Sequence, residues 1–117
     1  MSTIKVNSIE PANAGSEDYY LPKAWVNFNG SGTVAIRQGG NVSSITDLGT
    51  ADYDVNLSNA IVDANYGLAG WAASATSIGQ TGSVDGSTYS TTAFNTRSAH
   101  YSQGFEDSPI ISVALVR

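Results

Sequence analysis

Few residues in this sequence have the types and spacing that catalysis or metal binding would need. His100, between Ala99 and Tyr101, is the single histidine, and the chain contains no cysteine. A zinc site requires several His or Cys ligands. A serine hydrolase requires a histidine beside its nucleophile, which is often presented in a Gly-x-Ser-x-Gly turn that is absent here. We therefore interpret His100 as a surface or core histidine, with a glycan or interface contact as the alternative.

Paired carboxylates are the second candidate for chemistry, because glycosidases and calcium sites use them. They occur at Glu17-Asp18, at Asp52 with Asp54, and at Glu106-Asp107. Alternate positions place Asp52 and Asp54 on one face of a strand. We interpret that face as solvated, and ion binding or glycan depolymerisation remain as alternatives. No phosphate-binding glycine motif occurs, so the sequence predicts a non-enzymatic protein without a cofactor or metal.

Charge excludes one class of partner. The 117 residues include 5 Lys and Arg against 10 Asp and Glu, for a net charge of −5, and only 13% of residues are charged. Such a chain has no basic patch to neutralise phosphates, so we expect no nucleic-acid partner. No apolar run reaches the roughly 18 residues of a membrane span, and Met1 is followed by Ser-Thr-Ile-Lys rather than by the basic segment and apolar run of a signal peptide. We expect a soluble, unprocessed protein without a membrane partner.

Alternation of apolar and polar residues predicts short β-strands. The clearest is 52–57, where Tyr53, Val55 and Leu57 alternate with polar residues. Asn29-Gly30-Ser31-Gly32 is typical of a hairpin turn. The predicted strands are 2–9, 24–29, 33–37, 42–47, 52–57, 65–72, one within 89–98, and 110–116. Between them we expect a linker at 10–22, a turn at 38–40, a loop or one helical turn at 58–63, and a long loop or ragged edge at 74–87.

Seven or eight short strands separated by regular turns indicate an all-β fold. We predict an antiparallel β-sandwich for residues 23–117, with a small barrel as the alternative. Residues 1–22 form an extended N-terminal arm and linker in this prediction. The length fits one domain of ordinary size.

Aromatic residues in the predicted strands are expected to be buried, because they contribute much of the apolar area of a core. We assign them to the core or to a subunit interface, and they are Trp25, Phe28, Tyr53, Tyr66 and Trp71. Strict alternation puts Trp25 and Phe28 on opposite faces of one strand, unless a bulge intervenes near Asn27. A sugar-stacking platform could form later in the chain, with packing as the alternative use, from Tyr89, Phe94, Tyr101 and Phe105.

Several segments resemble the tail-fibre proteins of bacteriophages, especially cyanophages and marine phages. The resemblance rests on Leu21–Arg37, Asn41–Asp47, Gly49–Leu57, Asp63–Tyr66 and Ser112–Arg117. The opening Ser2–Ile9 is similar to the start of such fibres. Residues 74–108 match least.

The resemblance implies a homotrimeric structural protein on the exterior of the virion. Its N-terminal arm would attach it to other capsid or tail proteins through Ile4, Val6 and Ile9. Host-surface glycan would be contacted by Tyr89, His100 and Tyr101. The alternative role is a decoration or cement protein of the capsid or tail, without a receptor.

Overall fold

The computed structural model describes residues 2–7, 21–73, 78–81, 88–100 and 104–117, without the side chains of 78–81 and 100. These residues form nine β-strands and no helix. The strands are β1 (Pro22–Asn29), β2 (Ala35–Gly40), β3 (Val42–Gly49), β4 (Asp52–Leu57), β5 (Gly67–Ala73), β6 (Ile78–Thr81), β7 (Ala93–His100), β8 (Gly104–Phe105) and β9 (Ile110–Val116). The all-β prediction is confirmed.

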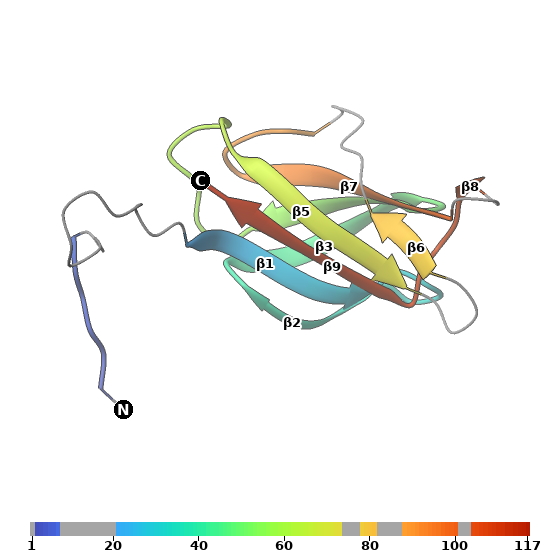
Figure 1. Ribbon diagram of the computed structural model, residues 1–117, viewed down its shortest axis with the longest axis horizontal. Coiled ribbons are helices and arrows are strands. Elements are labelled where there is room, and N and C mark those ends of the chain that lie inside the picture. Colours follow the sequence, from blue (N-terminus) through green and yellow to red (C-terminus); the bar gives the residue numbers. More distant parts are fainter. Residues whose placement is uncertain (1, 8–20, 74–77, 82–87, 101–103) are drawn as a thin grey trace.

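The strands form two antiparallel layers (Figure 1). One layer has the order β2-β1-β9-β5, and the other has the order β3-β4-β7. Strand β6 joins the layers along one side, because it pairs with β5 through Ala72 and Ala73 and with β7 through Ser98 and Ala99. On the opposite side, β2 and β3 share no ladder within the described residues. The predicted sandwich is confirmed, with one side curled shut and the other open.

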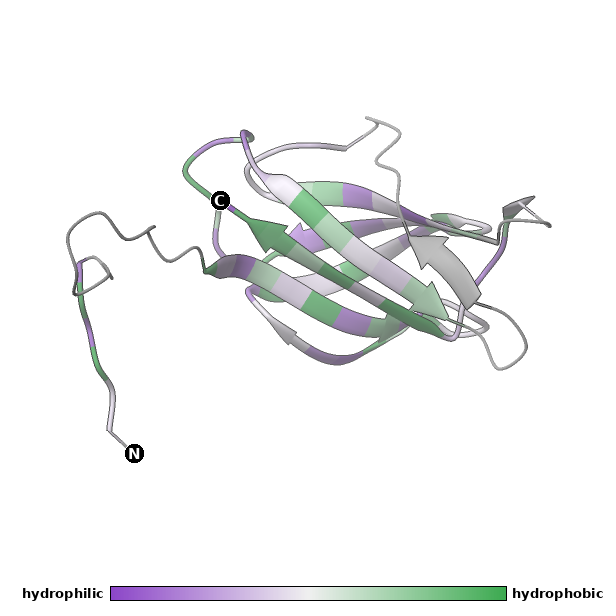
Figure 2. Cartoon of the chain, in the orientation of Figure 1, coloured by the Kyte–Doolittle hydropathy of each residue, from purple (hydrophilic) through white to green (hydrophobic). Residues whose placement is uncertain are grey.

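Burial follows the alternation that the sequence predicts. Tyr53 and Val55 of β4 are fully buried, while Asp52 and Asp54 are partly exposed. Figure 2 shows that β9, an inner strand of its layer, is hydrophobic along most of its length. The inward side chains form one core that includes Ala24, Val26, Phe28, Tyr53, Val55, Ile61, Tyr66, Ala72, Phe94, Ile111, Val113 and Leu115. Phe28, Tyr53 and Tyr66 are therefore core residues, as expected.

The hairpin between β1 and β2 forms where the sequence predicts it. The Asn29 side chain closes the turn, since its Oδ1 accepts the Ser31 N–H at 3.1 Å and its Nδ2 donates to Thr33 O at 3.0 Å. Gly32 has a φ of 67°, which favours glycine. The second strand begins at Ala35. Trp25 and Phe28 lie on opposite faces of β1, as strict alternation predicts, and the register shift between Asn27 and Phe28 leaves Arg37 of β2 as the extra residue.

The predicted turn at 38–40 is wrong. Gly39 and Gly40 belong to β2 and pair with Val26 and Trp25. The chain instead passes from one layer to the other at Asn41, whose φ is 56°. Asparagine tolerates this left-handed conformation because its short side chain can bond nearby backbone. The Asn41 Nδ2 donates to Lys23 O and Asn59 O, each at 3.1 Å, which fixes the crossing.

Other boundaries also differ from the prediction. Residues 2–7 form no strand, although alternation predicted one over 2–9, because a strand needs a neighbour to complete its hydrogen bonds. Residue 22 of the predicted linker is the first residue of β1. The strand expected within 89–98 spans 93–100, and β6 lies inside the expected loop at 74–87. The nine strands exceed the predicted seven or eight.

Tyr53 links the two layers through polar contacts at the end of its buried ring. Its hydroxyl lies 2.8 Å from Gly30 O and 2.9 Å from Asp107 Oδ1. The same Asp107 oxygen accepts the Ala51 N–H at 2.7 Å. Gly30 is required beside this hydroxyl, because a Cβ there would lie 2.5 Å from the Tyr53 oxygen. Burial, and then the adjacent Asp107 carboxylate, raise the pKa of Tyr53 well above its usual value.

This shift predicts a loss of stability at alkaline pH. A tyrosine in the unfolded chain ionises near pH 10, whereas folded Tyr53 resists ionisation, so its contribution is complete below about pH 10 and falls as the pH rises further. We expect Tyr53→Phe to flatten this decline, measured as the free energy of urea unfolding at about pH 8 and pH 11. A shallower slope remains from Tyr66, whose pKa burial also raises. An unchanged slope in Tyr53→Phe would contradict the assignment.

The core assignment predicts a large difference between two leucines. Leu115 is fully buried on β9, whereas Leu48 on β3 is 49% exposed. We expect Leu115→Ala to lower the free energy of unfolding by about 2–5 kcal/mol, because it leaves a cavity. The matched control Leu48→Ala should change it by no more than about 0.5 kcal/mol. Equal effects in urea unfolding would be inconsistent with this core.

Candidate functional site

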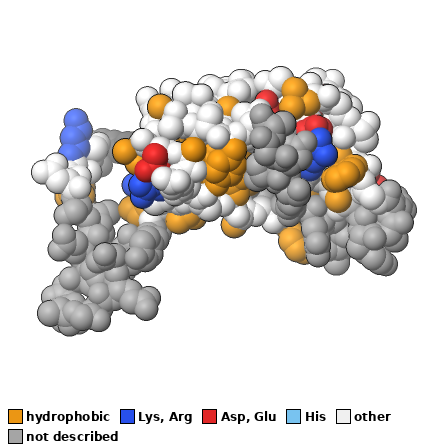
Figure 3. Space-filling model, turned by 90° about the horizontal axis from the view of Figure 1, so that it is seen from above, with side chains coloured by type: hydrophobic (Ala, Val, Ile, Leu, Met, Phe, Trp, Pro, Cys, Tyr) orange, Lys and Arg blue, Asp and Glu red, His pale blue; other side chains and the backbone are white. Residues whose placement is uncertain are grey.

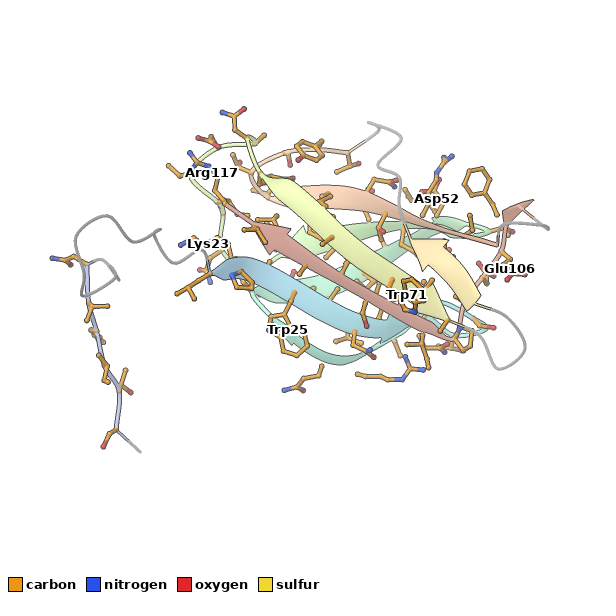
Figure 4. The ribbon with its side chains drawn as sticks, viewed as in Figure 1. Lys23, Trp25, Asp52, Trp71, Glu106 and Arg117 are labelled. Atoms are coloured by element: carbon orange, nitrogen blue, oxygen red, sulfur yellow. The ribbon has the colours of Figure 1, made fainter. Side chains whose placement is uncertain are left out.

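The two tryptophans of the chain lie at the surface. Trp25 is 42% exposed and Trp71 is 51% exposed. Their predicted place in the core is wrong, while the alternative of a subunit interface stays a prediction. Ala24, Val26 and Phe28 of β1 point inward, so Trp25 points outward. Ala72 of β5 points inward, so its neighbour Trp71 also points outward. Both indoles therefore belong to the outer face of the same layer (Figure 4).

A shallow groove separates the two indoles. Strand β9 lies between β1 and β5, and its Ala114 pairs with Trp25 on one side and with Ala69 on the other. Ser112, two residues earlier, pairs with Trp71. The groove has a volume of about 320 Å³ and is lined by Trp25, Val26, Ala69, Gly70, Trp71, Ser112, Val113 and Ala114. Its lining combines small residues of β9 and β5 with the two indoles.

Gly40 determines where the Trp25 ring lies. Gly40 is the cross-strand partner of Trp25, and a Cβ at Gly40 would lie 2.7 Å from Trp25 Nε1 and 3.0 Å from its Cδ1. The indole therefore occupies the space above the glycine and leans from β1 toward β2. This position leaves Ala114 uncovered on the other side of Trp25. Because the ring rests on the sheet, it is fixed without a partner molecule.

A row of polar groups crosses the sheet beside Trp71. The Asn27 Nδ2 donates to Ser112 Oγ at 2.8 Å, and Arg37 Nη1 lies 3.4 Å from Asn27 Oδ1. The Arg37 Nη2 also donates to Pro109 O at 2.5 Å. Among the described residues no carboxylate pairs with Arg37. Ser112 in the groove lining is thus connected through Asn27 to a cation on β2.

The two layers carry different charges. Strands β1, β2, β5 and β9 contain no Asp or Glu, and their charged residues are Lys23 and Arg37. The other layer contains Asp47 on β3 and the pair Asp52 and Asp54 on β4. The groove therefore lies on the layer whose strands carry no carboxylate. The whole chain is nevertheless acidic.

Asp52 and Asp54 form a structural network. The Asn95 Nδ2 donates to Asp52 Oδ1 at 2.8 Å and to Asp54 Oδ1 at 3.0 Å. Asp52 also forms an ion pair with Arg97 at 2.9 Å, and Thr88 Oγ1 donates to Asp54. The carboxylates share one strand face, as predicted. The two carboxylates are partly exposed to solvent and are also bound by Asn95, Arg97 and Thr88.

The predicted glycan-contact residues are only partly described. Tyr89 is 38% exposed, and its ring stacks on Tyr66 with centroids 4.4 Å apart. Its hydroxyl donates to Tyr66 O, so the ring is held by packing. His100 ends β7, and its backbone pairs with Gly104. The His100 side chain and Tyr101 lie outside the described residues.

The predicted attachment residues lie at the N-terminal end. Ile4 is 87% exposed and Val6 is 59% exposed, while Ile9 lies outside the described residues. An apolar side chain that is this exposed gains free energy when a partner covers it. These two residues are therefore free for the contact that the prediction assigns to them.

A second hollow lies beside the C-terminal end of β9. It is lined by Lys23, Asn41, Ala60, Ile61, Val62 and Arg117. Arg117 is not available to a ligand there, because it forms a bidentate pair with Asp63 at 2.7 and 2.9 Å. Hydrogen bonds from Arg117 and from the Asn65 N–H lower the pKa of Asp63 to about 2. Figure 3 shows acidic and basic side chains next to each other on the visible face of the protein.

The described residues contain no cluster of three His, Cys, Asp or Glu side chains able to hold a metal ion. No helix long and apolar enough to cross a membrane occurs in the described part of the chain. No protein-family model, curated protein or solved structure matches the chain.

Sequence reasoning missed the groove, although one signal was available. Because side chains alternate along a strand, Trp25 lies on the opposite face from Val26 and Phe28, and it points outward once Phe28 is assigned to the core. Trp71 carries a weaker signal, since Gly70 and Ala72 on either side are small. The pairing of Trp25 with Gly40 required the register of β2, which the predicted turn at 38–40 obscured.

The seat of Trp25 over Gly40 predicts an optical change. In a Trp71→Phe background, where Trp25 is the single tryptophan, Gly40→Ala should displace the indole toward solvent and shift its emission to longer wavelength. Stability should fall by less than about 1 kcal/mol, since a side chain and not backbone has to move. Gly67→Ala on β5 is the matched control, because a Cβ there meets nothing within 4 Å. Identical spectra for the two variants would contradict the position of the Trp25 ring over Gly40.

Proposed function

We propose that this chain is a non-enzymatic structural module on the exterior of a bacteriophage particle. Residues 1–22 attach it to capsid or tail proteins, and the β-sandwich presents a contact surface at the end of a short fibre, as a homotrimer. The observation that carries the proposal is the coexistence of two separate exposed apolar surfaces, Ile4 with Val6 and Trp25 with Trp71. A small module that joins a particle to a second surface needs two such regions.

Support for attachment by the arm comes from its composition and exposure. Residues 2–7 pair with no strand of the sandwich, so their backbone groups are available to complete a sheet in a neighbour. Strand addition of this kind combines main-chain hydrogen bonds with pockets for alternate side chains. Ile4 and Val6 stand at alternate positions, as that mode requires. The tail-fibre resemblance of Ser2–Ile9 points in the same direction.

Support for a role without catalysis comes from the paired carboxylates. Asp52 and Asp54 both accept hydrogen bonds from Asn95, and Asp52 is also paired with Arg97. A glycosidase instead needs one protonated carboxyl group and one free carboxylate on either side of a substrate. The contacts of this pair serve to join β4 to β7.

A decoration or cement protein is the second candidate. The observation that favours it is the open side of the sandwich, where the edges of β2 and β3 are unpaired within the described residues. Unpaired strand edges are templates for association with another chain. In this role the sandwich itself contacts neighbouring capsid or tail proteins and no host receptor is bound.

Attachment through the arm predicts that two side chains control incorporation into particles. In phage carrying the full-length gene, we expect Ile4→Ser with Val6→Ser to reduce the amount of this protein in purified virions by at least about tenfold, because the apolar contact is lost. Quantitative mass spectrometry of gradient-purified particles measures it. Thr3→Ala with Lys5→Ala is the matched control at the alternate positions and should incorporate normally.

Absence of the wild-type protein from purified particles would refute the virion assignment. Normal incorporation of the Ile4 and Val6 double variant would refute attachment by the arm and would favour the decoration role. Reducing-end release from host polysaccharide by the purified protein would overturn the assignment as a non-enzymatic module.

A further inference from the structure

We propose that the groove between Trp25 and Trp71 binds an acidic oligosaccharide. This site deepens the proposed contact role and rests on it for its biological setting. The sugar rings stack on the two indoles, their hydroxyl groups bond to Ser112 and Asn27, and a carboxylate of the sugar pairs with Arg37. The surface predicted from sequence, around Tyr89, His100 and Tyr101, is a different one.

The indoles are arranged to receive rings. The face of an indole carries partial negative charge, which attracts the C–H groups of a pyranose. Trp25 rests on Gly40 and is held in place without a ligand, so little side-chain entropy is lost when a ring stacks on it. Strands β1 and β5 are two strand spacings apart, roughly 10 Å. More than one sugar unit is needed to reach both indoles.

Besides aromatic faces, a sugar needs space for its rings and hydrogen-bonding partners for its hydroxyl groups. Ala69, Gly70 and Ala114 leave room for rings to approach the sheet. Ser112 and Asn27 hydrogen-bond to each other and keep further acceptor and donor capacity for hydroxyl groups. A volume of about 320 Å³ lies at the lower end of the range for small-ligand pockets. This combination of apolar lining with a few fixed polar groups is what such pockets share.

Charge selects an acidic sugar. The four strands of this layer contain no carboxylate, although the chain has twice as many acidic as basic residues. The Arg37 guanidinium is oriented by the neutral acceptors Asn27 Oδ1 and Pro109 O. Because no described carboxylate neutralises it, its remaining donors can form a charge-assisted pair with a uronate.

The dimensions favour a saccharide over a second copy of the chain. A stable protein interface buries about 800 Å² on each partner and uses about 20–30 residues a side. The groove is lined by eight residues and holds about 320 Å³. Those dimensions suit a short oligosaccharide better than a broad protein surface.

The test uses the tryptophans themselves, because both lie in the groove and the chain has no other. Intrinsic fluorescence of the full-length protein is titrated with a mannuronate hexasaccharide and, in parallel, with neutral maltohexaose. We expect a saturable change with the acidic sugar and at least about tenfold weaker binding of maltohexaose. Arg37→Gln should abolish this preference.

Variants separate the groove from the rest of the surface. Trp71→Ala should weaken binding of the mannuronate hexasaccharide by at least about tenfold, measured by calorimetry. Trp71→Phe, which keeps an aromatic face, should weaken it less and replaces the alanine variant if that variant does not fold. Leu48→Ala is the control, because Leu48 is an exposed apolar residue on β3 of the other layer, 49% accessible. It should bind as the wild type does.

Three outcomes would overturn the proposal. They are no saturable change at millimolar hexasaccharide, equal affinity of the wild type and Trp71→Ala, and light scattering that shows an oligomer dissociated by Trp71→Ala, which would make the groove a subunit interface. If virions contain the protein but the purified protein binds no sugar, this site is rejected and the proposed function stands. If the purified protein binds the sugar but is absent from virions, the site stands and the proposed function is rejected.

Discussion

The contact between Phe28 and Tyr53 is the interaction on which the rest of the structure depends. Their rings meet edge to face with centroids 5.2 Å apart, one ring from each layer. The hydroxyl of Tyr53 then reaches Gly30 and Asp107, so the buried ring also fixes the turn after β1 and the segment before β9. A chain without cysteine has no disulfide to join its layers. Packing of this aromatic pair, completed by hydrogen bonds at its polar end, takes that place.

Placing Phe28 inside has a consequence on the opposite face. Side chains alternate along a strand, so Trp25 points outward whenever Phe28 points inward. The register with β9 then puts Ala114 beside Trp25, and the register with β5 puts Ser112 beside Trp71. The groove is thus a product of the same registers that build the core. A slip of one residue in β1 would bury Trp25 and expose Phe28 together.

The sequence alone was sufficient for the fold class, for most strands and for the inward face of β4, because alternation with period two depends on local pattern. It was insufficient where a tertiary contact decides the outcome. Gly39 and Gly40 have turn-like composition, but Trp25 fills the space that a side chain at Gly40 would occupy, so the glycines extend β2. Residues 2–7 alternate like a strand but have no neighbour within the described chain. The groove needed residues from three strands, and their register is not local information.

The division of charge between the layers makes the two outer faces chemically different. The carboxylates on β4 bind Asn95 and Arg97 of β7 and so connect these two strands. The outer face of that layer is therefore polar. The face of β1, β9 and β5 has no carboxylate, and its indoles remain half exposed. Exposed indoles raise the free energy of the isolated chain relative to a covered state. The layer that contributes most strands to the core therefore also carries the apolar outer face on which the proposed contact is placed.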